Sequence, residues 1–250
     1  MHTVPEQSSA VVVGGASGIG AAVVDRHRAE GVRVVVWDLN EPASDADDWI
    51  ACDVGDPDAI DAALAATVAL AGVPDRVTVT AGVGHSGLLL DVSPDEWDRI
   101  MRVNARGPML AMRAFAGAMV DTGVSGSIVA TSSVSARLVD RSMGAYCASK
   151  AALSMVVQVA AVEWAVHGIR VNAVAPGVTR TPMLGRSPLD SGWLAAVQGR
   201  TPLGRLGLPG DVADAVIALH GLGWVTGQVL ECDGGLGRHS PIDSFGEMTR

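Results

Sequence analysis

The chain has 250 residues, 48% of them hydrophobic, which suits one α/β domain with a substantial core. Its formal net charge of −9 disfavours nucleic acids and anionic membrane surfaces as partners, because both are bound through lysine and arginine. The polar start Met1–Ser9 has no apolar signal core, and no stretch is judged long enough to span a bilayer.

Three widely spaced cysteines, Cys52, Cys147 and Cys232, form no metal-ligand or disulfide pattern. We therefore expect a cytoplasmic protein with reduced thiols, no bound metal and a single domain over residues 1–250. Residues 1–9 and 237–250 are expected to be flexible tails, and the second tail could instead reach a neighbouring subunit.

Short apolar runs alternate with longer helical patterns along the chain. The predicted strands are Ala10–Val13, Val32–Trp37, a very short Ile50–Ala51, Arg76–Thr80, Ser127–Thr131, Arg170–Ala175 and Gln228–Glu231. The predicted helices are Gly18–Glu30, Pro57–Ala71, Ser93–Val103, Ala105–Val120, Ala145–His167 and Asp211–Leu219. The alternation predicts an α/β fold, a Rossmann-type doubly wound parallel sheet with helices on both faces.

Local signals mark some of the ends. Ser93 is expected to cap its helix with Glu96 closing a capping box, and Gly168 is expected to stop the helix that ends at His167. Residues 182–210 are rich in glycine and proline and are predicted to be irregular, either a lid over a ligand or an ordinary surface loop.

The turn after the first strand reads Gly14-Gly15-Ala16-Ser17-Gly18-Ile19-Gly20. Such a turn lets backbone N–H groups approach a pyrophosphate at the positive end of the following helix. The spacing Gly14-x-x-x-Gly18-x-Gly20 resembles the short-chain dehydrogenase/reductase family. In that family the turn, with Ser17 and Ile19, binds a dinucleotide.

Asp38 ends the second strand, where a carboxylate can accept hydrogen bonds from the adenosine ribose hydroxyls and would repel a 2′-phosphate. Ser17 and Leu39 stand where NADP-preferring relatives tend to carry a basic residue. Arg33 lies at the opposite end of the strand. These residues predict NAD as the cofactor.

The resemblance extends to the next two strand ends. Asp53-Val54 matches an Asp-Val that contacts adenine, and Thr80-Ala81-Gly82 stands where the family has Asn-Ala-Gly. Thr80 for Asn, and Val13 for the usual Thr before the first glycine, put the polar support of the sheet in question at this point.

Tyr146 and Lys150 are four residues apart on a predicted helix and so share a face, and Tyr146 is the only tyrosine in the chain. A nearby ammonium favours the phenolate, so Lys150 is expected to lower the pKa of Tyr146 and make it a general acid–base. The same ammonium can bind the nicotinamide ribose.

The family resemblance implies three further roles. Ser133, thirteen residues before Tyr146, would orient the substrate oxygen, with the adjacent Ser132 as the less favoured choice. Asn104, in Asn-x-x-Gly, would hold a water of a proton relay, and a helix kink or cap is the alternative. Pro176-Gly177-Val178 and Thr181 would hold the nicotinamide carboxamide.

These motifs predict an NAD-dependent oxidoreductase, a homotetramer or at least a dimer, that interconverts a small secondary alcohol and a ketone. One alternative is a 3-oxoacyl-thioester reductase, although most of those use NADPH and Asp38 counts against it. A second is an NAD-sensing regulatory protein. His85, Met183, Leu184 and Trp193 could line the substrate pocket, or could serve only as loop and packing residues.

Overall fold

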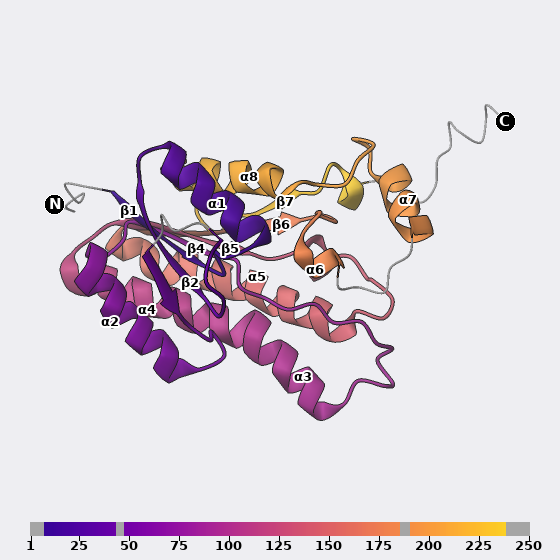
Figure 1. Cartoon of the computed structure of the whole chain (residues 1–250), viewed down its shortest axis with the longest axis horizontal. Helices are drawn as coiled ribbons and strands as arrows, with labels where there is room; N and C mark the ends of the chain where they lie inside the picture. The colour runs from indigo at the N-terminus through magenta and orange to yellow at the C-terminus, as the bar shows by residue number, and fades with distance from the viewer. Residues whose placement is uncertain (1–7, 44–47, 186–190, 239–250) are drawn as a thin grey trace.

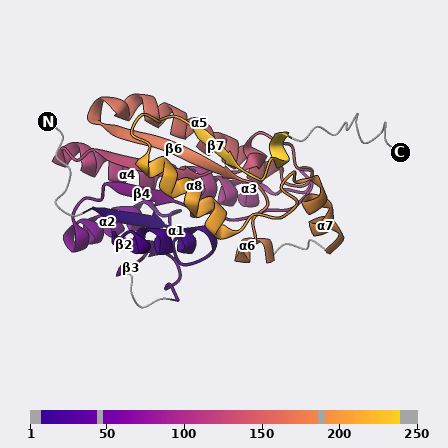
Figure 2. The ribbon, with the colours of Figure 1, turned by 90° about the horizontal axis from the view of Figure 1, so that it is seen from above.

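Seven parallel strands form one sheet in the order β3-β2-β1-β4-β5-β6-β7 (Figure 1). The computed structural model describes residues 8–43, 48–185 and 191–238 of the chain. The strands are β1 (Ser9–Val13), β2 (Arg33–Asp38), β3 (Asp48–Ala51), β4 (Arg76–Val79), β5 (Gly126–Thr131), β6 (Ile169–Pro176) and β7 (Val229–Cys232). Figure 2 shows β3 toward one edge of the sheet, and β6 and β7 toward the other.

The strand order reverses at β1, which pairs with β2 on one side and with β4 on the other. Val11, for example, lies opposite Val35 of β2 and Val77 of β4. In doubly wound sheets the crevice at such a reversal, beyond the carboxyl ends of the strands, is where ligands bind.

Helices cover both faces of the sheet. Helices α1 (Gly18–Ala29) and α8 (Pro209–Gly221) pack side by side on one face, and α2 (Pro57–Ala71), α4 (Gly107–Thr122) and α5 (Gly144–Trp164) cover the other (Figures 1 and 2). The remaining helices are α3 (Pro94–Met101), α6 (Pro182–Gly185), α7 (Ser191–Arg200), the π-helix η1 (Arg102–Arg106) and the 3₁₀ helices η2 (Val134–Ala136), η3 (Ala165–His167) and η4 (Leu236–Arg238).

Successive side chains of β1 point to opposite faces of the sheet, so they contribute to two separate hydrophobic cores. Val11 and Val13 face the core under α2, α4 and α5, whereas Val12 faces the core under α1 and α8. In the first core the Trp37 and Phe115 rings lie 4.7 Å apart, and the buried Trp37 Nε1 donates to Thr67 Oγ1 (2.8 Å). The structure therefore confirms the predicted fold class, a parallel sheet with helices on both faces.

The strands match the predicted runs to within about two residues, and Gly168, at a φ of 74°, caps the end of η3 as expected. The helix at Ser93 also begins as predicted, since Ser93 Oγ accepts from Glu96 N (3.2 Å). The capping box is wrong, because the Glu96 carboxylate bonds His85 and Arg99 instead.

Two other expectations need correction. The segment 182–210, predicted to be irregular, contains the helices α6 and α7, and its Gly207 forms a β-bridge with Thr179. Several of its glycines and prolines lie at or between the ends of these helices. Residues 186–190 lie outside the described chain. Ser9 belongs to β1, and Gly237 and Arg238 belong to η4, so these parts of the predicted tails are ordered.

The expectation that no apolar stretch could span a bilayer is also wrong by length and composition. Residues Gly144–His167 form the one helix among the described residues that is long and apolar enough, with a mean hydropathy of 1.4. One face of this helix packs against β6 in the core of the fold.

Candidate active site

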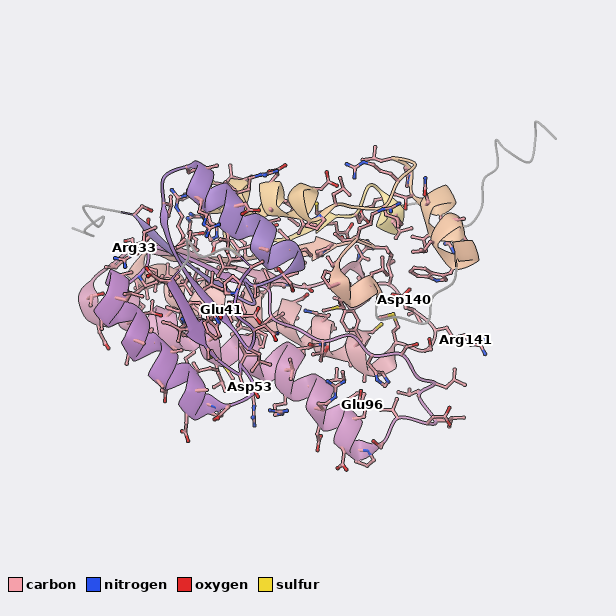
Figure 3. All side chains as sticks on the ribbon, in the orientation of Figure 1. Arg33, Glu41, Asp53, Glu96, Asp140 and Arg141 are labelled. Carbon is pink, nitrogen blue, oxygen red and sulfur yellow. The ribbon has the colours of Figure 1, made fainter. Side chains whose placement is uncertain are left out.

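The predicted site residues gather at one edge because all seven strands run in the same direction. They follow the carboxyl ends of β1 to β6, beside the point where the strand order reverses. Figure 3 shows Arg33 at the opposite end of the sheet from Asp140 and Arg141, which lie on the loop before α5.

The glycine-rich turn leaves no room for side chains at two positions. Gly14 has a φ of +83°, and a Cβ there would lie 2.5 Å from the backbone nitrogen of Ala81. A Cβ at Gly20 would overlap the Gly14 carbonyl oxygen. The turn therefore lies directly against the end of β4, which fixes where α1 begins.

The first turn of α1 is suited to an anion. Ser17 is its N-cap residue but makes no side-chain capping bond, and no acidic residue lies in the first turn. Backbone N–H groups at a helix start carry partial positive charge and bind phosphate when no side chain occupies them. The turn around Ser17, Gly18 and Ile19 thus fits the pyrophosphate of a dinucleotide.

Asp38 is tied to this turn. Its Oδ2 accepts from Ala16 N (3.0 Å) and its Oδ1 accepts from Asn40 N (3.0 Å). Leu39 beside it is 68% exposed. Arg33 pairs with Asp48 at the start of β2 (2.8 Å), so its charge lies at the far end of the strand, as predicted. The carboxylate of Asp38 therefore supports the turn and borders the space that follows it.

The end of β3 is shaped by a local turn. Asp53 Oδ1 accepts from Gly55 N (2.7 Å), and its other oxygen lies 3.8 Å from Arg102 Nη1. Val54 is buried, and a Cβ at Gly107 would lie 2.5 Å from the Val54 carbonyl oxygen. This close approach joins the Asp53-Val54 turn to the start of α4.

Thr80 supplies the polar support that the sequence put in question. Its Oγ1 lies 2.9 Å from the carbonyl oxygens of both Val13 and Gly14, and the Thr80 and Ala81 N–H groups donate to Val13 (2.8 and 3.1 Å). The Thr80 hydroxyl therefore ties the end of β4 to the end of β1, where position 13 is a valine and has no hydroxyl of its own.

Asn104 lies in the π-helix η1, a widened turn between α3 and α4. It is fully buried, its Oδ1 accepts from Val83 N (2.8 Å), and its Nδ2 donates to Val83 O (2.9 Å) and Ser149 Oγ (3.2 Å). A Cβ at Gly82 would lie 3.2 Å from Asn104 Oδ1 and 3.5 Å from Lys150 Nζ. The structure thus brings Asn104 and Lys150 together across Gly82, and the irregular helix proposed as the alternative is present too.

Lys150 and Ser133 approach Tyr146 from two elements. Lys150 Nζ is buried, donates to Thr131 O (2.8 Å) and lies 5.9 Å from the centre of the Tyr146 ring. Ser133 is a side-chain hydrogen-bond partner of Tyr146. Ser132 instead bonds Ser154 Oγ (2.6 Å) between β5 and α5, which favours Ser133 as the residue beside the phenol.

The predicted pKa shift of Tyr146 is wrong in this structure. Burial raises the pKa of Tyr146, and only the hydrogen bond to Ser133 opposes that rise. Burial also lowers the pKa of Lys150 to about 8. The lysine head is turned toward the Thr131 carbonyl, so desolvation outweighs its electrostatic effect on the phenol.

The segment after β6 completes the edge. A Cβ at Gly177 would lie 2.8 Å from the Asp233 side chain, so only glycine fits there after Pro176. Val178 O accepts from Gly207 N (3.0 Å), and Thr181 lies beside Gly18 at the start of α1. The predicted carboxamide-holding residues are therefore next to the predicted pyrophosphate turn.

One polar cluster at this edge was not predicted as a unit. His85 Nδ1 lies 2.9 Å from Glu96 Oε1, and Arg99 holds the same carboxylate through two bonds of 2.7 Å. The spacing of Glu96 and Arg99 on a helix was a visible signal, but the pairing with a loop histidine depends on tertiary structure. Gly84, before His85, lies against Met183 of α6.

Comparison with known proteins agrees with this geometry. Residues 14–237 match the family model described as Enoyl-(Acyl carrier protein) reductase. The chain is 37% identical over 248 residues to a (3R)-3-hydroxyacyl-CoA dehydrogenase of Canis lupus familiaris, covering 91% of this chain and 95% of the relative. It is 35% identical over 237 residues to a 2,5-dichloro-2,5-cyclohexadiene-1,4-diol dehydrogenase of Sphingobium indicum, covering 90% and 95%. The chain belongs to the short-chain dehydrogenase/reductase family.

Similar solved structures include two that hold a nicotinamide cofactor. A short-chain type dehydrogenase/reductase from Mycobacterium marinum has a TM-score of 0.85 at 32% identity, covering 92% of this chain and 95% of the other. A 3-ketoacyl-(acyl-carrier-protein) reductase from Brucella melitensis complexed with NADH has a TM-score of 0.84 at 29% identity (92% and 98%). The structure of ElxO with NADP bound gives 0.85 at 26% identity (92% and 98%). Family members of this fold therefore bind nicotinamide cofactors of both kinds.

Proposed function

We propose that this protein is an NAD-dependent dehydrogenase that interconverts a secondary alcohol and a ketone, with Tyr146 as the general acid–base. The observation that carries the proposal is the convergence of Tyr146, Ser133, Lys150 and Asn104 at the strand ends beside the glycine-rich turn. The two relatives named above are both dehydrogenases of hydroxyl compounds, which supports this reaction class.

The chain's own groups divide the chemistry between them. In reduction, the Tyr146 phenol donates its proton to the substrate oxygen as the alcohol forms, and Ser133 donates a hydrogen bond to the same oxygen. Oxidation is the reverse and requires the phenolate: because burial raises the pKa of Tyr146, the phenol must lose its own proton before it can take the hydroxyl proton of the substrate. When bound, the nicotinamide supplies the hydride acceptor. Lys150, with its pKa near 8, can pass a proton to or from the site, and Asn104 holds the backbone of Val83 beside it.

Asp38 supports NAD rather than NADP as the cofactor. Its carboxylate lies at the end of β2 and is bonded to the turn that fits a pyrophosphate. A 2′-phosphate placed there would face a like charge, which costs several kcal/mol unless a basic residue compensates. Arg33, the cation nearest in sequence, is paired with Asp48 away from this position.

A second candidate is a dehydrogenase of 3-hydroxyacyl thioesters, the reverse direction of a 3-oxoacyl-thioester reductase. The 37% identity to a (3R)-3-hydroxyacyl-CoA dehydrogenase favours it. The acyl thioester would present its hydroxyl to the same Tyr146 and Ser133, so the two candidates differ in substrate and not in mechanism.

The test is a substrate panel followed by absorbance of the reduced cofactor. Purified enzyme would be mixed with NAD or NADP and with simple secondary alcohols, diols and 3-hydroxyacyl thioesters. Turnover with NAD on any of these, and its loss in Tyr146→Phe, would support the proposal. No turnover with either cofactor, despite tight NAD binding, would instead favour the NAD-sensing regulatory role.

A further inference from the structure

Ser135 and Asp140, to which the proposed chemistry gives no role, form a hydrogen-bonded chain that ends on Ser133. Ser135 N donates to Ser133 Oγ (3.1 Å), and Ser135 Oγ donates to Asp140 Oδ2 (2.6 Å). Ser135 is only 7% exposed, whereas Asp140 lies on the exposed loop before α5 (Figure 3). The two hydrogen bonds of Ser135 therefore link the serine beside the phenol to a carboxylate.

This chain restricts what the Ser133 hydroxyl can do. A serine hydroxyl has one hydrogen and two lone pairs. Ser135 N occupies one lone pair, and Ser133 is also a side-chain hydrogen-bond partner of Tyr146. The hydrogen and the second lone pair are left for the Tyr146 oxygen and the substrate oxygen. The bond from Ser135 N thus fixes the Ser133 oxygen and leaves its hydrogen to be donated beside the phenol.

The Asp140 end of the chain is held by the segment that leads to Tyr146. Asp140 O accepts from the backbone N–H of Met143 (3.1 Å), which is the N-cap residue of α5. Ser135 follows Ser133 by two residues, and Asp140 precedes Tyr146 by six. The hydrogen bond between Ser135 and Asp140 therefore closes the loop that separates the two residues of the proposed chemistry.

We propose that Ser135 and Asp140 are positioning residues, which hold the Ser133 hydroxyl at the place beside Tyr146 that the reaction needs. The inference rests on the proposed function, in which Ser133 donates to the substrate oxygen. Both residues act through Ser133 and need not contact the substrate. Small misplacements of a group that meets the reacting atoms lower the rate strongly, so the anchor should be visible in turnover.

The test is a mutant cycle followed by reduction of a ketone with NADH. Wild type would be assayed on cyclohexanone, acetoin and acetoacetyl-CoA, and the variants on whichever is reduced fastest. Burial raises the pKa of Tyr146, and the charge of Asp140 adds to that rise. The phenol should therefore stay protonated at neutral pH in every variant, so that its charge state does not account for a difference in rate.

Ser135→Ala and Asp140→Ala should each lower kcat by about tenfold, as expected for a lost hydrogen bond to a charged group, with the KM for NADH unchanged. The double variant should lose no more than either single variant. Asp140→Asn keeps an oxygen that can accept from Ser135 and should retain most of the rate. In a Ser133→Ala background, adding Ser135→Ala or Asp140→Ala should change kcat by less than about twofold, because the hydroxyl that they position is gone.

Ser93→Ala is the control, since it removes a serine hydroxyl that caps α3 outside this chain and should leave kcat unchanged. Asp140 is exposed, so Asp140→Ala should fold even if Ser135→Ala does not, and thermal unfolding would check both. Unchanged kcat in Ser135→Ala and Asp140→Ala, or the same loss with and without the Ser133 hydroxyl, would overturn this inference alone. A wild type that reduces none of the substrates would overturn the proposed function, and this inference with it.

Discussion

Tyr146 and Lys150 lie one helical turn apart on α5, and burial acts on their protons in opposite directions. It raises the pKa of the phenol and lowers that of the ammonium to about 8, because each loses solvation of its charged form. The spacing of the pair was enough to predict their shared face. The direction of the shift was not predictable, because it depends on what covers the helix and on the Thr131 carbonyl that Lys150 meets.

Replacing Tyr146 with Phe tests the acid–base assignment. The ring and its packing remain and only the hydroxyl is lost, so NAD affinity should change little. Turnover should fall by about 10²–10⁴, the usual contribution of a positioned acid–base group. Steady-state kinetics and calorimetric NAD titration would measure the two effects.

Lys150→Met is the matched comparison for Tyr146→Phe. It removes the ammonium beside the predicted ribose position, so both turnover and NAD affinity should fall. Near-normal activity in Tyr146→Phe on the physiological substrate would show that the proton is handled elsewhere.

Asp38 is the residue that should decide between the two cofactors. Asp38→Asn keeps an oxygen that can accept from Ala16 N and removes the charge, so the turn should survive while repulsion of a 2′-phosphate is lost. We expect the preference for NAD over NADP to fall by at least about tenfold, equivalent to about 1.4 kcal/mol.

Fluorescence titration of wild type and Asp38→Asn with both cofactors would measure this preference. Asp38→Ala should lower NAD affinity further than Asp38→Asn, because it also removes the acceptor for the turn. Equal affinities of wild type for NAD and NADP would contradict the assignment of Asp38.

At the scale of elements, apolar periodicity predicted most of the fold because buried parallel strands are apolar on both faces. Helix α7 was missed because its sequence, with Trp193 and two alanines among glycines, has no clear apolar face. The π-helix Arg102–Arg106 overlaps the facing ends of two predicted helices, and local sequence does not reveal the bonds from Asn104 to Val83 and Ser149 that accompany its widened turn. Thr80 shows the same limit, because its role depends on how β4 meets β1.

The packing of α1 and α8 on the sheet encloses two histidines at the end opposite the candidate site. The His27 and His220 rings lie 5.6 Å apart, both buried, and His220 Nε2 bonds Thr78 Oγ1 (2.9 Å). Burial, and then the charge of Arg76, lowers the pKa of His27 from 6.5 to about 4. His220 has its pKa lowered as well, by burial and by His27, Arg76 and Arg170.

This packing should make the fold acid-labile. A histidine that is harder to protonate when folded than when unfolded favours unfolding as the pH falls from 6.5 toward 4, and its contribution is complete above pH 6.5. His27 alone should lower the free energy of unfolding by about 3 kcal/mol across that range. The carboxylates Glu96 and Asp211 have pKa values near 2, so their stabilising contributions to the fold are lost mainly at pH values below this range.

Urea unfolding at a series of pH values would measure the effect. His27→Gln should flatten the pH dependence between 6.5 and 4.5, whereas His167→Gln, at an exposed position, should leave it unchanged. Identical pH profiles for wild type and His27→Gln would show that the buried pair does not set acid stability.

At the scale of the whole molecule, the outer face of α5 and η3 is apolar and exposed. Met155, Val159, Val162 and Val166 follow one another at spacings of three and four residues, so they form one stripe, and Val162 is 80% exposed. The inner face of the same helix already packs on the sheet through Leu153 and Val157. A second apolar face on a helix that covers one sheet favours association with another copy of the chain.

We predict that this stripe lies in the interface of a homotetramer, or at least a dimer. Val162→Arg places a charge in the middle of the stripe, and burying it without a partner would oppose assembly. Light scattering after size exclusion should then show a shift from the wild-type oligomer toward monomer. Far-ultraviolet circular dichroism should stay unchanged, because residue 162 is exposed in the single chain.

Leu70→Arg is the control, since Leu70 is a 42% exposed leucine on α2 and lies outside the stripe. It should leave the oligomer intact, so that any dissociation in Val162→Arg can be assigned to position and not to added charge. A wild-type protein that is monomeric at micromolar concentration would contradict the predicted assembly. An oligomer that tolerates Val162→Arg but dissociates in Leu70→Arg would move the interface from α5 to α2.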